Sequence, residues 1–250
     1  FPHSLGLLYS AFTYYTGFKV NSGEYKLMGL APYGKPKFKD LIIDKLLDLK
    51  EDGSFKLNMK YFNYATGLTM TNDKFSKLFG KSVRDPKKDL LNEFHMDIAA
   101  SIQAVTEVIV LRLAKNLVKD YKIKNLCLAG GVALNCVANG KILKEKIFEN
   151  IWIQPAAGDA GGSLGAALAY WHHELKMPRR DFKDQMKGSY LGPKFENRFI
   201  EEKLKTLKAK YQKEDSNKII SLTAKKLSQE KIVGWFQGRM EFGPRALGGR

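Results

Sequence analysis

The stretch Leu126-Cys-Leu-Ala-Gly-Gly-Val-Ala-Leu-Asn135 decides the fold, together with Ile151-Trp-Ile-Gln-Pro-Ala-Ala-Gly-Asp-Ala-Gly-Gly-Ser163, which follows it along the chain. Each is a short apolar run that ends at glycines, the pattern of a strand that leads into a tight turn. Helical segments surround both runs, so strand and helix alternate as they do in an α/β domain. Backbone N–H groups at such turns favour phosphate, and two turns at consecutive strand ends therefore suggest a nucleotide or acyl-phosphate site between them.

Hydrophobic spacing predicts the remaining elements. The clearest helix covers residues 92–121, where apolar side chains recur every three or four residues along one stripe. Residues 69–90 show no clear pattern, and Trp152, Trp171 and Trp235 are expected in the core. The other predicted helices span residues 4–15, 25–31, 38–50, 134–144, 162–176, 196–211 and 216–229, and the predicted strands span residues 55–57, 61–64, 125–129, 150–154 and 231–236.

The composition fits a folded domain with an anionic partner. Hydrophobic residues make up 44% of the chain, and 42 Lys and Arg against 26 Asp and Glu give a net charge of +16. This charge favours a nucleotide, an acyl phosphate or a nucleic acid, although a lysine-rich surface produces the same number. The basic residues are spread without a long run, so nucleic-acid binding is not expected. No apolar run reaches the ~20 residues of a membrane span, and we expect neither a signal peptide nor a membrane partner.

The two cysteines and the chain ends suggest a cellular context. Cys127 and Cys136 form neither a disulfide framework nor a zinc spacing, which fits a reducing cytoplasm, and both are expected to be buried. The chain starts at Phe1 without a methionine and stops at Arg250 inside a Gly/Arg-rich motif. We therefore expect it to be part of a longer protein.

Four segments resemble one family. They are His3-Ser-Leu-Gly-Leu-Leu-Tyr-Ser-Ala-Phe12, Gly23-Glu-Tyr-Lys-Leu-Met-Gly-Leu-Ala-Pro-Tyr-Gly34, Leu128-Ala-Gly-Gly-Val-Ala-Leu-Asn135 and Gly238-Arg-Met-Glu-Phe-Gly-Pro-Arg-Ala-Leu-Gly248. In this order they look like the NodU/CmcH carbamoyltransferases, which carbamoylate hydroxyl groups of nodulation factors and antibiotics. The resemblance covers nearly the whole chain.

The resemblance implies a fold of two modules. Residues 1–177 would be an actin/hexokinase-like (ASKHA) half-domain with a mixed sheet and flanking helices, without its N-terminal part. Residues 178–195 would connect it to residues 196–250, the start of a YrdC-like α/β domain. In this family the YrdC-like module makes carbamoyl-adenylate from ATP and carbamoyl phosphate, and the ASKHA module transfers the carbamoyl group with a bound metal, typically iron. The family's histidine ligands would precede Phe1 and most of the YrdC-like module would follow Arg250, so we do not expect this stretch to be active alone.

The glycine turns supply the predicted nucleotide site. Gly130 and Gly131 would admit the ligand, and the Asn135 amide would bind a ribose or phosphate oxygen. The alternative is a tight turn in which Asn135 caps the next helix. Phosphate would also meet backbone donors of the second turn, at Gly158, Gly161, Gly162 and Ser163.

One carboxylate is a candidate metal ligand. Asp159 follows a strand end inside a glycine-rich turn, where a carboxylate can bind a divalent cation. The resemblance implies Fe(II), with Mg²⁺ as an alternative. The other interpretation is that Asp159 caps the helix that starts near Gly162.

Five further residues are candidates for catalysis or anion binding. Lys26 and Glu24 lie in the second of the four segments, where they are either catalytic groups or a solvated pair at the lip of the site. His3 is a candidate proton donor or substrate-positioning group. Arg239 and Arg245 match the bidentate geometry of carbamoyl phosphate or another anion, or else form salt bridges with Glu241. The remaining histidines are expected on the surface or fully hydrogen-bonded, and they are His95, His172 and His173.

Together with these residues, the resemblance implies an ATP-dependent O-carbamoyltransferase. A hydroxyl of a sugar-containing or other small acceptor would attack the carbamoyl carbon, and adenylate would leave. The alternatives are a tRNA threonylcarbamoyl-adenosine-type transferase and a non-catalytic nucleotide-binding module. The sequence leaves the oligomeric state open, with a homodimer as one option.

Overall fold

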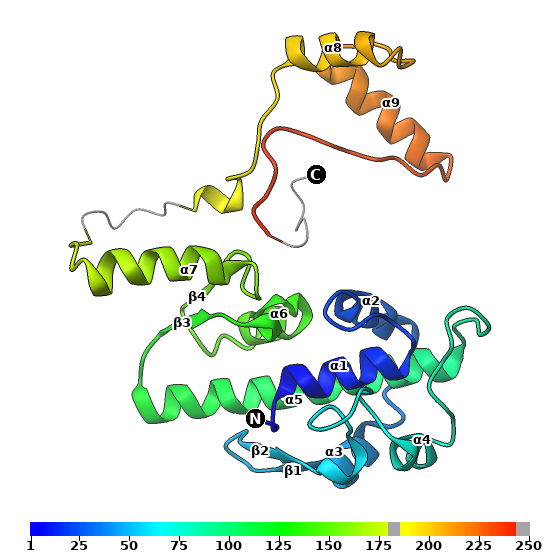
Figure 1. The fold of residues 1–250 in the computed structure, drawn as a ribbon, viewed down its shortest axis with the longest axis vertical. Helices are drawn as coiled ribbons and strands as arrows, with labels where there is room; N and C mark the ends of the chain where they lie inside the picture. The colour runs from blue at the N-terminus through cyan, green and yellow to red at the C-terminus, as the bar shows by residue number, and fades with distance from the viewer. Residues whose placement is uncertain (180–185, 244–250) are drawn as a thin grey trace. The chain divides into compact units, whose positions relative to one another are not determined.

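The computed structural model of the chain describes residues 1–179 and 186–243 (Figure 1). The chain divides into two compact units, Phe1–Gly158 and Asp159–Arg250. In the first unit the helices are α1 (Leu5–Tyr15), α2 (Glu24–Leu30), α3 (Lys39–Leu46), α4 (Asp73–Phe79), α5 (Glu93–Tyr121) and α6 (Cys136–Lys144), and the strands are β1 (Leu47–Leu49), β2 (Phe55–Leu57), β3 (Asn125–Leu128) and β4 (Asn150–Ile153). In the second unit the described helices are α7 (Gly161–Ala169), which continues as a π-helical turn (Tyr170–Glu174), α8 (Asn197–Thr206) and α9 (Ser216–Ser228).

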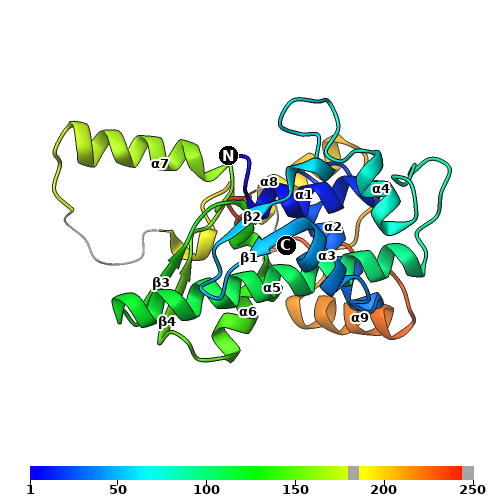
Figure 2. The same cartoon turned by 90° about the horizontal axis from the view of Figure 1, so that it is seen from below.

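The core of the first unit is built along α5. The side chains of Ile98, Ile102, Val105 and Ile109 are fully buried there, and α1, α2 and α3 pack against them (Figure 2). Burial of each such side chain contributes roughly 1.5–3 kcal/mol. The predicted apolar stripe of residues 92–121 is confirmed over this part of the helix. Its last two members, Leu113 and Leu117, are exposed.

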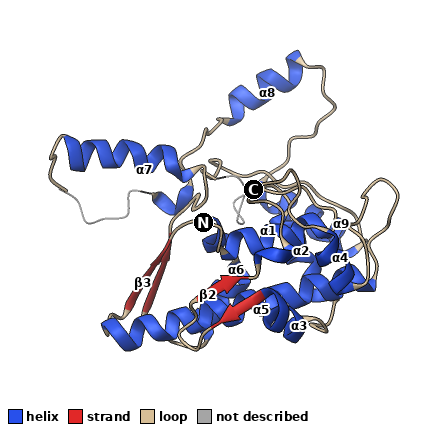
Figure 3. Ribbon diagram, turned by 60° about the horizontal axis from the view of Figure 1, so that its bottom comes forward, coloured by secondary structure: helices blue, strands red, loops and turns tan. Residues whose placement is uncertain are grey.

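The strands form two separate small sheets (Figure 3). β1 and β2 pair antiparallel, whereas β3 and β4 pair in parallel. Leu126, Leu128 and Ile151 pack against a small core formed by α5, α6 and Phe148. The predicted α/β class is therefore confirmed, but neither sheet of the described residues is mixed.

Several predicted elements have other boundaries. The helix predicted over residues 38–50 ends at Leu46, because the chain continues directly into β1. Residues 61–64 make a 3-10 turn (Met59–Tyr61) and one isolated bridge instead of a strand. Residues 231–236 form no strand either, since no described segment pairs with their backbone. Within residues 69–90, where no pattern was clear, the chain forms α4.

The expected burial of the cysteines and tryptophans is wrong. Cys127 and Trp152 face each other across β3 and β4, and both are exposed. The opposite face of this sheet, which carries Leu126, is the one that packs on α5 and α6. Cys136, Trp171 and Trp235 are exposed as well. A short sheet covered on one side buries only alternate residues, which periodicity alone does not reveal.

Among the described helices, α5 has the length and apolar character to cross a membrane. Two observations give it another role. In its most apolar window, 67% of the helix is buried inside the protein, and the side chains buried there form the core of the first unit. α5 is therefore the central helix of this unit.

Candidate functional site

The ends of β3 and β4 place two glycine bends side by side. Beyond the parallel pairing of the strands, the Gly130 N–H donates to the Ala157 carbonyl over 2.8 Å. A Cβ on Gly158 would lie 3.8 Å from the Cα of Gly131. The two sequence runs that predicted a site therefore meet at one edge of the sheet, within the first unit.

The first bend needs glycine at one position and leaves space at the next. Gly130 has φ 96° and ψ 164°, a conformation that side chains strongly disfavour. Gly131 is exposed, and a Cβ there would meet nothing within 4 Å. Its N–H has no acceptor in the part of the chain that the structure describes. In the second bend the buried Ala156 has φ 53°, a strained value for a residue other than glycine.

Asn135 is the N-cap of α6, as the capping alternative predicted. Its Oδ1 accepts the Ala138 N–H over 3.0 Å. Its amide also pairs with Gln103 of α5, because Nδ2 donates to Gln103 Oε1 over 3.0 Å and Oδ1 accepts from Gln103 Nε2 over 3.2 Å. One N–H of Asn135 Nδ2 has no acceptor among the described atoms, so capping leaves one donor available.

Two other segments of the resemblance lie beside this bend. A Cβ on Gly6 of α1 would lie 3.6 Å from Val132 Cγ2, and Met28 Sδ of α2 lies 4.0 Å from Cys136 Sγ. Residues 3–12, 23–34 and 128–135 are therefore neighbours in the first unit, although they lie far apart in the sequence.

The three candidate catalytic residues are in different surroundings. Glu24 Oε1 accepts from Ser10 Oγ over 2.8 Å and from the Asn21 N–H over 2.9 Å, so it ties α2 to α1. Lys26 is exposed and has no ion pair among the described residues. His3 Nδ1 accepts the Leu57 N–H over 3.0 Å, which leaves Nε2 as its proton donor. The structure thus gives Glu24 and His3 structural contacts and leaves Lys26 solvated.

The second bend continues into the second unit, where Asp159 and Ser163 lie. The Asp159 side chain does not cap α7, whose N-cap is Ala160. Instead the Asp159 carbonyl accepts the Gly162 N–H over 3.0 Å. Ser163 Oγ donates to the Ala160 carbonyl over 3.2 Å, and Gly161 opens α7.

The metal prediction has one candidate ligand in this structure. In the described residues, no three His, Cys, Asp or Glu side chains gather closely enough to hold a metal ion. The exposed Asp159 carboxylate is a single donor. The residues present do not make a metal site by themselves.

The predicted anion-binding arginines lie in the Gly/Arg-rich motif of the second unit. Arg239 Nη1 donates to the Gly192 carbonyl over 2.7 Å, and the Gly192 N–H donates to the Met240 carbonyl over 2.9 Å. Arg239 therefore helps to hold residues 189–193 against residues 239–242. Arg245 lies outside the described residues.

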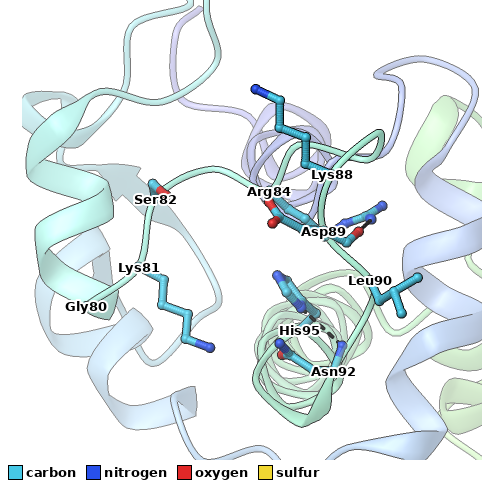
Figure 4. Close-up of a pocket in the computed structure, with 9 residues that line it drawn as sticks. All are labelled: Gly80, Lys81, Ser82, Arg84, Lys88, Asp89, Leu90, Asn92 and His95. Carbon is cyan, nitrogen blue, oxygen red and sulfur yellow. Dashed lines mark hydrogen bonds between the residues drawn. The ribbon is translucent and has the colours of Figure 1, made fainter.

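A polar pocket of about 740 Å³ lies at the N-terminal end of α5 (Figure 4). Arg84 donates from Nε to the Thr16 carbonyl and from Nη1 to the Asp89 carbonyl, over 2.6 and 2.7 Å. His95 Nδ1 accepts the Asn92 N–H, which completes the capping box of α5. These bonds hold the loop that precedes α5, and His95 is a satisfied histidine as predicted. The lining residues are Gly80, Lys81, Ser82, Arg84, Lys88, Asp89, Leu90, Asn92 and His95.

Comparison with known proteins places the chain in a family. A family model for the carbamoyltransferase N-terminus matches residues 1–168, and one for the carbamoyltransferase C-terminus matches residues 224–250. The chain belongs to the carbamoyltransferase family. The resemblance inferred from the four segments is confirmed.

The relatives of this carbamoyltransferase chain are longer. It is 64% identical over its full length to an uncharacterized protein of Synechocystis sp., of which it covers 41%. It is 36% identical to the nodulation protein NolNO of Sinorhizobium fredii, with 100% of the chain and 35% of that protein covered. For the nodulation protein NolO of Bradyrhizobium diazoefficiens the identity is 34%, with 99% and 42% covered. The chain thus spans less than half the length of these relatives.

Three polar residues behind the first glycine bend of this carbamoyltransferase chain were not predicted from the sequence. Tyr9 of α1 donates to Gln103 Oε1 over 3.0 Å, and Gln103 Nε2 donates to Glu107 Oε1 over 3.0 Å. Gln103 and Glu107 lie on α5 one turn apart, among apolar core residues. Both lie beside the apolar stripe of α5 and not within it, so periodicity alone does not indicate that they are buried.

Proposed function

We propose that the protein to which this chain belongs is an ATP-dependent O-carbamoyltransferase, and that residues 126–158 of the first unit help to bind its adenylate. The observation that carries the proposal is the pair of glycine bends at the ends of β3 and β4. They lie side by side, expose backbone at Gly131, and occur in a chain of the carbamoyltransferase family. Backbone N–H groups arranged in this way favour phosphate.

The proposed reaction is acyl transfer from carbamoyl-adenylate, formed from ATP and carbamoyl phosphate. The oxygen of an acceptor hydroxyl forms a bond to the carbamoyl carbon, the bond from that carbon to the phosphate oxygen breaks, and AMP leaves. The hydroxyl proton passes to a base. The residues of this chain hold the adenylate, through the Gly131 N–H and the remaining N–H of Asn135. Asp159 alone does not make a metal site, so no step of the proposal depends on a metal.

A matched pair of glycine substitutions tests the site in the full-length protein. Gly131→Ala and Gly140→Ala each add one methyl group where nothing lies within 4 Å, and neither glycine has a positive φ. Both variants should therefore fold. If adenylate lies against Gly131, Gly131→Ala should weaken transfer by about 10-fold or more, whereas Gly140→Ala should leave it unchanged.

The assay follows both products of the reaction. The full-length protein is incubated with ATP, carbamoyl phosphate and candidate small-molecule alcohols. The proposal predicts AMP release together with a mass gain of one carbamoyl group on the alcohol. Equal activity of the two glycine variants would refute the site.

The net charge of +16 favours a transferase that acts on tRNA as the second candidate. Tight, salt-dependent binding of tRNA without carbamoylation of any alcohol would support this alternative. Adenylate binding without turnover in the full-length protein would instead indicate a non-catalytic nucleotide-binding module.

A further inference from the structure

A buried chain of polar side chains lies directly behind the first glycine bend. It begins at Tyr9 of α1 and passes through Gln103 of α5 to Glu107 of α5 and to Asn135, the N-cap of α6. Glu107 in turn forms an ion pair with the exposed Lys141 of α6. Tyr9, Gln103, Glu107 and Asn135 are each at least nine-tenths buried. This row of polar side chains ties α6, the helix that follows the bend, to α5, the central helix of the unit.

Gln103 is the centre of this chain and has no unused hydrogen-bonding capacity. Its Oε1 accepts from Tyr9 Oη and from Asn135 Nδ2, both over 3.0 Å. Its Nε2 donates to Glu107 Oε1 over 3.0 Å and to Asn135 Oδ1 over 3.2 Å. Two donors and two acceptor positions are all that a glutamine amide offers.

The groups at the two ends of this hydrogen-bonded row, Glu107 and the Ala138 N–H, decide which atom donates and which accepts in each of its bonds. Glu107 forms an ion pair with Lys141, so its carboxylate only accepts and Gln103 must present its NH₂ group to it. At the other end the backbone N–H of Ala138 only donates, so Asn135 must present Oδ1. Both requirements give the same orientation of the two amides.

Tyr9 supports this orientation. Burial raises the pKa of its hydroxyl, and the nearby charges of Glu107 and Glu24 raise the pKa further. The hydroxyl therefore stays protonated and donates to Gln103 Oε1 throughout the physiological pH range.

We propose that Gln103 is a positioning residue for the nucleotide: it fixes the amide of Asn135 so that the second Nδ2 N–H remains available to an oxygen of bound adenylate. This inference rests on the proposed function. The ligand atom is an acceptor oxygen of a ribose hydroxyl or a phosphate group. Without Gln103, only the capping bond to the Ala138 N–H holds the Asn135 amide, so its Nδ2 group is held less firmly, and Glu107 loses a donor inside the protein.

Two substitutions and one control test the proposal in the full-length protein, with AMP as the probe. Gln103→Leu keeps most of the side-chain volume and removes all four hydrogen bonds. Asn116→Leu is its control, because Asn116 is a partly exposed amide on the same helix whose bond to Asp120 lies at the surface. Gln103→Leu should weaken AMP binding about 10- to 100-fold, and Asn116→Leu should leave it unchanged. All affinities are measured well below the Tm of each variant.

Gln103→Glu gives a readout that a merely structural role would not move. The new carboxyl group would face Glu107, and two such groups share one proton whose pKa is raised. Tyr9, Glu24, Cys136 and Lys141 are the other titratable groups around it. A protonated Glu at position 103 regains one donor, so the ratio of variant to wild-type Kd should rise about 10-fold from pH 6 to pH 8.

Each outcome decides between the proposals. A wild-type protein that binds no AMP and transfers no carbamoyl group would overturn the proposed function and this inference with it. AMP binding by the wild type, together with an unchanged Kd of Gln103→Leu or a Kd ratio of Gln103→Glu that is flat with pH, would overturn the inference alone. An equal loss in Asn116→Leu would also overturn it.

Discussion

His95 shows how one side chain couples folding of the first unit to pH. Its Nδ1 accepts the Asn92 N–H at the start of α5, a bond that requires an unprotonated Nδ1. Burial lowers its pKa below the ordinary value of 6.5, the charges of Arg84 and Lys81 lower it further, and Asp89 partly opposes them. The folded protein therefore resists protonation of this ring.

This shift predicts a loss of stability at mildly acid pH. Below pH 6.5 the unfolded chain binds a proton on His95 that the folded protein excludes, so the free energy of unfolding decreases as the pH falls from 6.5 toward the folded-state pKa. Urea unfolding at a series of pH values between 7.5 and 5 measures this decrease in the free energy of unfolding. His95→Gln is the control, because glutamine at this position of a capping box still accepts the N–H and does not titrate. If the free energy of unfolding had the same pH dependence in the wild type and in His95→Gln, the prediction would be contradicted.

Between elements, α5 holds the segment that follows α2. Asp97 accepts the Lys35 N–H and the Lys37 ammonium, each over 2.7 Å. A Cβ on Gly34 would collide with the backbone of Met96, so glycine is required for this close approach even though its φ is ordinary. Part of the Gly23–Gly34 segment is therefore explained by packing against α5.

Asp97→Asn should loosen this contact. Burial alone would raise the pKa of Asp97, but the bonds from Lys35 and Lys37 and their charges outweigh it, so the pKa is lowered and the folded carboxylate is ionised. Asparagine keeps one acceptor and removes the charge, which should cost about 1.5–3 kcal/mol. The exposed Glu93 bonds the same Lys37, and Glu93→Gln should cost under about 1 kcal/mol. Chemical denaturation at pH 7 measures the loss of unfolding free energy in each variant. Equal losses in the two variants would refute the prediction.

Elements with local causes could be predicted from the sequence, and elements that need a distant partner could not. The helix of residues 92–121 and the strands at 125–129 and 150–154 follow from periodicity and from glycines, and they agree with α5, β3 and β4 within a residue or two. Residues 61–64 and 231–236 have the composition of strands, but a strand exists only where another segment pairs with it.

The candidate site likewise contains one part that could be predicted from the sequence and one part that could not. The neighbouring bends of Gly130 and Gly158 follow from consecutive parallel strand ends, which the sequence shows. The pairing of Gln103 with Asn135 joins residues 32 positions apart, and its bond to Tyr9 spans 94 positions. Such contacts are set by how helices pack, and a single sequence carries no local sign of them.

Over the whole chain, the family segments are distributed between two units of different character. The first unit contains a buried core along α5 and a polar network behind one glycine bend. In the second unit, no residue of α7, α8 or α9 is buried, and apolar side chains such as Phe199 and Ile219 are exposed. Burial of apolar surface is the main stabilising contribution, so the first unit should dominate the stability of the chain.

Two isoleucines allow this difference to be measured with one chemical change. Ile102 of α5 is 0% exposed and Ile219 of α9 is 41% exposed. Ile102→Ala should lower the free energy of unfolding by about 2–5 kcal/mol, because it removes a fully buried side chain and leaves a cavity. Ile219→Ala should lower it by about 1–1.5 kcal/mol, because part of the transfer free energy is absent at a site that is 41% exposed and no closed cavity remains. Urea unfolding of residues 1–250 gives both values, and amide exchange should be slowest between Ile98 and Ile109 and fast in α9. Equal losses for the two variants, or equal protection of α5 and α9, would show that the second unit is stabilised as strongly as the first.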